Sequence, residues 1–130
     1  MTKPHDWLEF AHEDLILAEA ALEKGIYNQA CFHAQQGVEK ALKGFLRAHQ
    51  RSVPKTHALS ELLTICRRLD GSFQKLEASC TKLDQYYIPT RYPDALPGIG
   101  PEGLPTRQDA GEAVALLRSA LGWIEDKIKP

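Results

Sequence analysis

The sequence predicts an all-α fold, an up-and-down antiparallel bundle of five helices with one long loop, rich in proline and glycine, before the last helix. Apolar residues recur at the helical period along most of the chain, and no stretch alternates polar and apolar residues as a half-buried strand does. Residues that end helices separate these periodic stretches. With 130 residues, 43% of them hydrophobic and 25% charged, the chain is expected to form a single ordered domain over residues 1–130.

The first two predicted helices are long. One is expected from about residue 7 to residue 24, entered past Pro4 and ended by Gly25. The next is expected from about residue 28 to residue 50, with Asn28 as its cap. Pro54 ends this region, because a proline disfavours helical geometry in the residue before it.

Three further helices are predicted. Thr56 can cap a helix over residues 58–69, and another is expected over residues 73–87. Residues 88–106 contain five prolines and three glycines, which predicts a long irregular loop. A loop of this length in a small bundle is often functional, although it can also serve only as a connection. Thr106 and Asp109 form a capping box that starts the last helix, which then carries a continuous apolar stripe.

Charge is segregated along the chain, although the formal net charge is only −1. Residues 1–39 sum to −5, residues 40–68 to +6 and residues 69–130 to −2. We call residues 40–68 the basic segment. Such a segment suggests an anionic partner or an acidic neighbour, for which the chain's own first helix is a candidate. The alternative is a solvated helix surface, because runs of charge are often no more than that.

The second predicted helix separates into a polar and an apolar side. At about 100° per residue, an arc of roughly 80° contains only polar residues. We call this arc the polar face; it consists of Gln29, His33, Gln36, Lys40, Lys43 and Arg47. Glu39 lies at its border and can pair with Lys43 four residues later. The face has donors to offer to an anion or a nucleobase, or it is solvated surface.

One carboxylate interrupts the apolar side of the first predicted helix. That side consists of Leu8, Ala11, Leu15, Ala18, Ala21 and Leu22. Asp14 points into its middle, where an unpaired carboxylate would be strongly destabilising. We therefore expect Asp14 to be buried and bonded to a basic or polar side chain of another helix, either as a structural pair or as part of a site.

Several kinds of site are not indicated. The sequence has no GxxxxGK[ST], GxGxxG or HExxH motif, and its five histidines show no metal-ligand spacing, so no metal or cofactor is expected. Three cysteines without a CxxC pair predict reduced thiols in a cytoplasmic protein, with Cys31 as a core residue. No apolar run has the length of a membrane span, and residues 1–10 do not resemble a signal peptide.

Four stretches of the sequence carry a family resemblance. They are Ala11-x-x-Asp14-Leu15-x-x-Ala18, Gly25-Ile26-Tyr27-x-x-Ala30-x-Phe32-x-Ala34-Gln35-Gln36-x-x-Glu39-Lys40-Ala41-Leu42-Lys43, Thr56-His57-x-Leu59 and Arg91-Tyr92-Pro93-Asp94. In this order and at these distances, the set resembles the HEPN domain over nearly the whole chain. The resemblance implies an all-α bundle that usually forms a homodimer. Phe32, at the edge of the second helix, is an apolar residue that one small bundle does not readily cover.

The resemblance also implies partners and an activity. Stand-alone prokaryotic members are commonly paired with a minimal nucleotidyltransferase, often as a toxin–antitoxin module, and active members of the wider superfamily are metal-independent ribonucleases. Their signature is an arginine followed after four to six residues by a histidine. That signature is not completed after Arg91, where residues 96–98 are Leu, Pro and Gly.

One match to the spacing occurs elsewhere, since Arg51 and His57 have five residues between them. This pair spans Pro54, where a turn and the start of a helix are the ordinary interpretation. Ribonuclease chemistry needs a base for the 2′-hydroxyl proton and a cation for the phosphate. Arg91 can supply the cation, whereas a base such as His33 or His57 can reach it only through the fold.

We therefore expect a nucleotide- or RNA-interacting HEPN protein that acts with a nucleotidyltransferase partner in a toxin–antitoxin-like module. The expected binding residues are Arg91, Asp94, Gln36, Lys40 and Lys43, with Arg91 the candidate catalytic residue. Arginine offers a rigid fork of donors to phosphate, and Asp94 can orient it or contact a ribose hydroxyl; alternatively the two pair with each other to hold the loop. Two other functions remain open: a metal-independent ribonuclease toxin with a non-standard base, and a non-enzymatic module whose basic surface docks an acidic protein.

Overall fold

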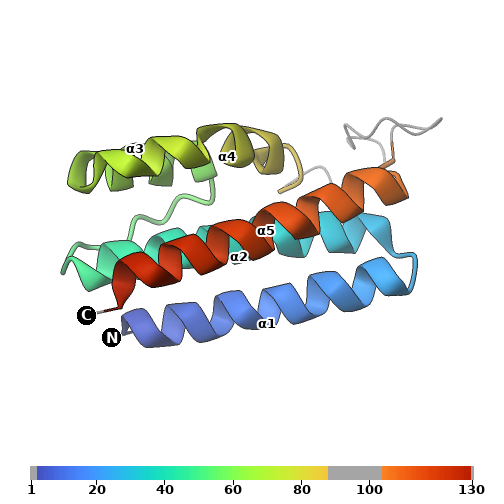
Figure 1. Ribbon diagram of the computed structural model, residues 1–130, viewed down its shortest axis with the longest axis horizontal. Helices are drawn as coiled ribbons and strands as arrows, with labels where there is room; N and C mark the ends of the chain where they lie inside the picture. The colour runs from blue at the N-terminus through green and yellow to red at the C-terminus, as the bar shows by residue number, and fades with distance from the viewer. Residues whose placement is uncertain (1–2, 88–103, 130) are drawn as a thin grey trace.

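A computed structural model describes residues 3–87 and 104–129 of the chain (Figure 1). The helices in these ranges are α1 (Pro4–Glu23), α2 (Tyr27–Ala48), α3 (Leu59–Leu69), the 3-10 helix η1 (Gly71–Leu76), α4 (Glu77–Asp84) and α5 (Arg107–Ile128). No strand occurs within the described ranges, and the predicted all-α class is confirmed.

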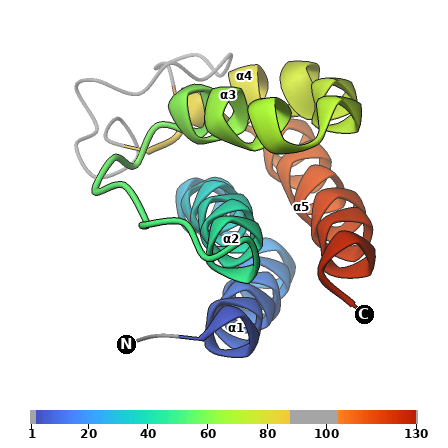
Figure 2. The same ribbon diagram turned by 90° about the vertical axis from the view of Figure 1, so that its left-hand side faces the viewer.

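Three long helices lie side by side, and α3 and α4 cover one side of them (Figures 1 and 2). α1 runs antiparallel to α2, because Gly44, near the end of α2, faces Trp7 at the start of α1, while Asp14 further along α1 pairs with Lys40 and His33 earlier in α2. α2 and α5 run in the same direction, because Gly37 faces Leu117 and Gly44 faces Ile128. The strict up-and-down alternation expected from the sequence therefore does not extend to this pair.

The connection between α2 and α3 explains the parallel pair. After α2 ends at Ala48, the chain turns back along that helix, so that His57 lies beside Gln35 and Glu39. This extended segment takes the place of a returning helix. α3 and α4 then form a hairpin in which Asp84, at the end of α4, contacts the first turn of α3.

Left-handed residues end the first two helices. Gly25 has φ +77°, and the amides of Gly25 and Ile26 bond back to carbonyls of the last turn of α1, which confirms the predicted stop. Gln50 adopts φ +57° in the same motif after α2, so this helix ends at Ala48 and not at residue 50. α1 begins at Pro4, three residues earlier than expected, because proline is well tolerated in the first turn.

The helix predicted over residues 73–87 is the least accurate expectation. The chain forms η1 first, capped by the Asp70 side chain on the Ser72 amide, and the α-helix covers only Glu77–Asp84. The capping box before α5 is confirmed: Thr106 Oγ1 accepts from the Asp109 amide at 3.1 Å, and the Asp109 carboxylate accepts from the Thr106 amide at 2.8 Å.

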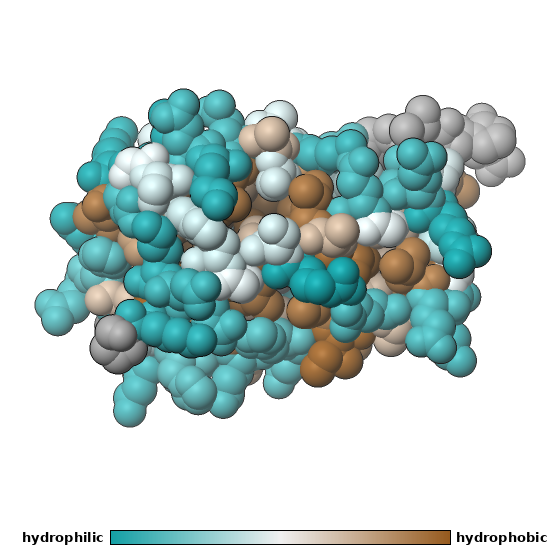
Figure 3. All heavy atoms as spheres, viewed as in Figure 1, coloured by the Kyte–Doolittle hydropathy of each residue, from teal (hydrophilic) through white to brown (hydrophobic). Residues whose placement is uncertain are grey.

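α2 is the central helix and contributes the largest share of the buried core. Gly37 lets α5 approach closely, since a Cβ at that position would lie 2.6 Å from Leu117 Cδ1. The face in Figure 3 is mostly hydrophilic, with hydrophobic side chains gathered near its middle over α5 and the adjoining part of α1. Within the described ranges, no helix is long and apolar enough to cross a membrane.

Candidate functional site

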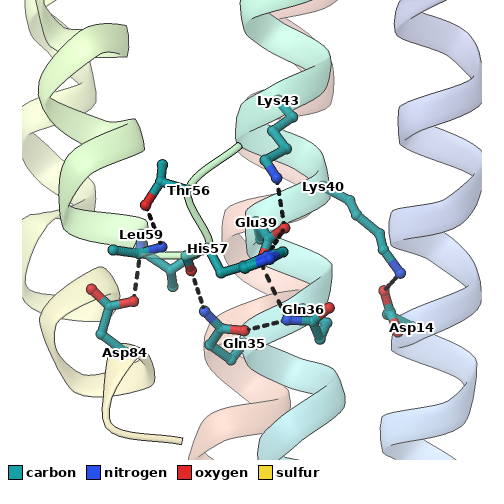
Figure 4. Close-up of polar contacts among 11 residues, drawn as sticks. Asp14, Gln35, Gln36, Glu39, Lys40, Lys43, Thr56, His57, Leu59 and Asp84 are labelled. Atoms are coloured by element: carbon teal, nitrogen blue, oxygen red, sulfur yellow. Dashed lines mark hydrogen bonds and ion pairs between the residues drawn. The ribbon is translucent and has the colours of Figure 1, made fainter. Parts of the chain in front are cut away.

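The polar face of α2 lies between α1 and the segment that leads into α3 (Figure 4). It is not one uniformly solvated arc. Gln29 is exposed, and His33, Gln36, Lys40 and Arg47 are half-buried. Lys43 is buried, and its Nζ bonds to Glu39 and lies 5.9 Å from the centroid of the Trp7 ring of α1. Two buried carboxylates, one on each side, organise the face.

Asp14 is the first of these carboxylates and lies on the α1 side. It is only 3% exposed, and its two oxygens accept from Lys40 Nζ at 2.6 Å and from His33 Nδ1 at 2.9 Å. The predicted burial and cross-helix pairing of Asp14 are confirmed. Lys40 belongs to the basic segment, so part of that segment's charge is balanced by the chain's own first helix. Lys40 and His33 still keep about a quarter of their side chains in solvent.

Glu39 is the second carboxylate and lies on the α3 side. It is 4% exposed and accepts from Lys43 Nζ at 2.8 Å, Gln36 Nε2 at 3.2 Å and His57 Nδ1 at 3.1 Å. The predicted Glu39–Lys43 pair is confirmed, although it is buried and not at the border of a solvated face. Three donors satisfy a charge that would otherwise be costly to bury.

His57 is the exposed end of the Glu39 network. Its side chain is 50% exposed, and its ring stacks on Tyr87 with a centroid distance of 4.9 Å and an interplanar angle of 17°. Tyr87 in turn stacks on Phe32 at 6.3 Å. We call Phe32, Tyr87 and His57 the aromatic stack. Phe32 is therefore half-buried by this contact, and the bundle covers part of the residue that the sequence placed at its edge.

The backbone around His57 is anchored as firmly as its ring. The His57 carbonyl accepts from Nε2 of Gln35, a fully buried side chain, at 2.9 Å. The Asp84 carboxylate accepts from the amides of Leu59 and Ser60 at 2.7 and 3.0 Å. Thr56 was predicted as the cap of α3, but its hydroxyl accepts from the Ala58 amide at 3.1 Å. The amides in the first turn of α3 instead donate to the Asp84 carboxylate of α4.

The structure brings three of the predicted binding residues together. Gln36 lies between the two carboxylate networks, and its amide is held by bonds to Gln35 Oε1 at 2.8 Å and to Glu39. Lys40 is the half-exposed cation of the Asp14 network, whereas Lys43 faces inward. Arg91 and Asp94 lie outside the described residues.

The Arg51–His57 spacing does not correspond to an interacting pair in the described part of the chain. Arg51 is exposed at the turn after α2, and His57 is directed at Glu39 and Tyr87. No hydrogen bond joins the two side chains among residues 3–87.

The three cysteines and a groove between α3 and α4 are not part of this site. Burial raises the pKa of the cysteine thiols to about 12, which makes them poor nucleophiles; they are Cys31, Cys66 and Cys80. A shallow groove of about 520 Å³ lies between α3 and α4. Its charged side chains already have partners, since Arg67 pairs with Glu77 and Lys82 with Glu112.

Sequence reasoning missed that Gln35 and Glu39 are the anchors of the site. Helical periodicity places Gln35 beside apolar neighbours, and nothing in it shows that a later segment returns to be bonded by this amide. The available signal was the motif set itself. Gln35, Gln36, Glu39 and His57 all belong to the quoted stretches, and in the structure they form one network.

Comparisons with known proteins agree with the motifs. The sequence matches the model of the HEPN domain over residues 4–127. It is 40% identical to TT1696 from Thermus thermophilus, whose crystal structure matches with a TM-score of 0.82 over 98% of this chain and 99% of that one. It is 33% identical to ST0689, an archaeal HEPN homologue, with a TM-score of 0.77 over 99% of this chain and 100% of that one. No curated protein matches. The chain belongs to the HEPN domain family.

Proposed function

We propose that this protein binds a nucleotide or RNA through the exposed part of the polar face of α2 and the adjoining aromatic stack. HEPN proteins have RNA- or nucleotide-related roles. The observation that carries the proposal is the placement of the half-exposed Lys40 ammonium beside the half-exposed His33 and Gln36 side chains, on the helix that also carries Phe32 of the stack. Charged donors suit phosphate, and aromatic faces suit bases.

Arg91 and Asp94 complete the proposed site. Arg91 follows Tyr87 by four residues, and four residues of chain reach at most about 14 Å. It is therefore available to hold a phosphate beside the aromatic stack, and it keeps its charge at any physiological pH. Asp94 orients this guanidinium or contacts a ribose hydroxyl.

The proposed protein partners are a second copy of the chain and a minimal nucleotidyltransferase, in a cytoplasmic toxin–antitoxin-like module. Partly exposed apolar residues support a homodimer: Phe10 is 43% and Leu17 50% exposed on α1. Light scattering at micromolar concentration should give twice the protomer mass, and a monomer would contradict this part of the proposal.

A metal-independent ribonuclease is the second candidate function. The observation that favours it is the Glu39–His57 pair, in which a buried carboxylate orients a half-exposed imidazole. His57 could supply the proton acceptor that the sequence lacks after Arg91, where the ribonuclease signature would place a histidine. Docking of an acidic protein has less support, because Lys40, Lys43 and Arg67 of the basic segment pair within the chain.

Arg91→Ala tests the proposal. Parent and variant are titrated with mononucleotides and a short RNA, and both are melted thermally. The affinity of the variant should fall by roughly 1.5–3 kcal/mol, the contribution of a charge-assisted contact, with an unchanged melting temperature. Arg68→Ala, at an exposed arginine of α3, is the matched control and should bind like the parent. Unchanged affinity in folded Arg91→Ala would remove Arg91 from the site, and a lowered melting temperature would indicate that it only holds the loop.

A further inference from the structure

A network of buried polar groups holds one half-exposed side chain in this protein. Gln35, Glu39 and Lys43 are at most 5% exposed, and all belong to the network that fixes His57. Tyr87 covers one face of its ring. Burying three polar side chains is unfavourable unless each is bonded, so a surface histidine without a role would not require this arrangement.

The network determines which ring nitrogen carries the proton. Nδ1 lies 3.1 and 3.3 Å from the two oxygens of the Glu39 carboxylate, which can only accept. Nδ1 therefore donates, and in the neutral ring Nε2 is left as an acceptor. Among the described residues, Nε2 has no hydrogen-bond partner, and half of the side chain is in solvent.

We propose that His57 Nε2 accepts a hydrogen bond from a ribose 2′-hydroxyl of the bound nucleotide or RNA, and so selects ribose over sugars without that hydroxyl. This inference rests on the proposed function. In the neutral ring, Nε2 needs a hydrogen-bond donor from the ligand, and an ionised phosphate has none. Base donors differ from one nucleotide to the next, whereas the 2′-hydroxyl is present in every ribonucleotide.

Glu39 and Tyr87 act as positioning residues in this arrangement. The carboxylate fixes the tautomer and the stacked phenol ring fixes the plane, so Nε2 is preorganised before the ligand arrives. This arrangement penalises ligands without the hydroxyl more than it favours ligands that carry it. A ligand without the hydroxyl leaves an oriented acceptor unpaired once the site is desolvated, which lowers its affinity.

The test uses a fluorescein-labelled 12-nucleotide RNA and its 2′-fluoro counterpart of the same sequence, which keeps an RNA-like sugar but cannot donate. By fluorescence anisotropy, the parent protein should bind the RNA about five- to tenfold more tightly than the 2′-fluoro strand. His57→Phe, which keeps a ring to stack on Tyr87, should weaken binding of the RNA and bring the two affinities within twofold. His12→Phe is the matched control, because His12 is a 47% exposed histidine bonded to Glu125 elsewhere in the fold, and it should keep the preference.

The outcomes separate this inference from the proposed function. Equal binding of both strands by the parent would overturn the inference and leave RNA binding intact, and this comparison needs no variant to fold. Equal weakening of both strands in His57→Phe would overturn it as well, because the ring would then contact phosphate or base. Absence of binding to either strand would overturn the proposed function and this inference with it.

Discussion

Replacing Asp14 with alanine should lower the free energy of unfolding, because this carboxylate joins α1 to α2. Asp14 is 3% exposed and bonded to Lys40 at 2.6 Å and His33 at 2.9 Å. Removing one partner of a fully buried ion pair costs about 3–5 kcal/mol, since the other charge is left without compensation. Here Lys40 and His33 keep 28% and 24% of their side chains in solvent and can recover part of that energy from water. We therefore expect a loss of about 2 kcal/mol.

Urea denaturation followed by circular dichroism measures this loss. The midpoint should fall while the slope stays constant, and the melting temperature should drop by roughly 6–10 °C. Lys40→Met, made alone and together with Asp14→Ala, closes a double-mutant cycle whose coupling energy should be at least about 1 kcal/mol. Asp126→Ala is the control, because that side chain is 77% exposed, and it should stay within about 0.5 kcal/mol of the parent.

Either of two results would refute the reasoning on Asp14. An Asp14→Ala protein as stable as the parent would mean that the carboxylate does not support the α1–α2 contact. A coupling energy near zero would mean that Lys40 is not its energetic partner, whatever the distance between them.

Gly37→Ala should lower the free energy of unfolding in urea by about 1–2 kcal/mol, because the new Cβ would collide with Leu117 of α5. Gly122→Ala is the control: no atom lies within 4 Å of its Cβ, so this variant should be more stable than the parent. Asp84→Ala should cost about 1 kcal/mol by the same assay, since it removes the acceptor of the first two amides of α3, and an unchanged midpoint would mean that water replaces it. The pKa of Asp70 is lowered to about 2 by hydrogen bonds from the Ser72 hydroxyl and amide and by Lys127. The folded form thus binds this proton more weakly than the unfolded chain, and the contribution is present at neutral pH and lost as the pH falls from about 4 towards 2. Carboxyl NMR titration should show that pKa, and Ser72→Ala should raise it towards the ordinary range.

Local sequence signals predicted much of the fold. Gly25 and the Thr106–Asp109 capping box identify helix ends because each acts through its own backbone neighbours. Asp14 was equally predictable, since a carboxylate in the middle of an apolar helix side requires a partner. The partner itself depends on how α1 and α2 pack, so it could not be read from the sequence.

Features that depend on distant contacts were not predictable. Periodicity placed Lys43 on a polar arc, but in the fold it is buried with Glu39 and lies over the Trp7 ring of α1. The cap of α3 comes from Asp84, 25 residues away, and the expected cap, Thr56, has a minor role. The parallel direction of α2 and α5 was also not predictable, because an extended segment, and not a helix, runs back along α2 to the start of α3.

Mapping the ligand-binding surface by NMR tests the central claim most directly. Amide and imidazole resonances of ¹⁵N-labelled protein are followed while the 12-nucleotide RNA is added. The largest changes should fall on His33, Gln36, Lys40 and His57 and on the amide of Tyr87. Changes confined to the groove between α3 and α4, or no changes at millimolar RNA, would contradict the assignment of nucleotide or RNA binding to the polar face of α2.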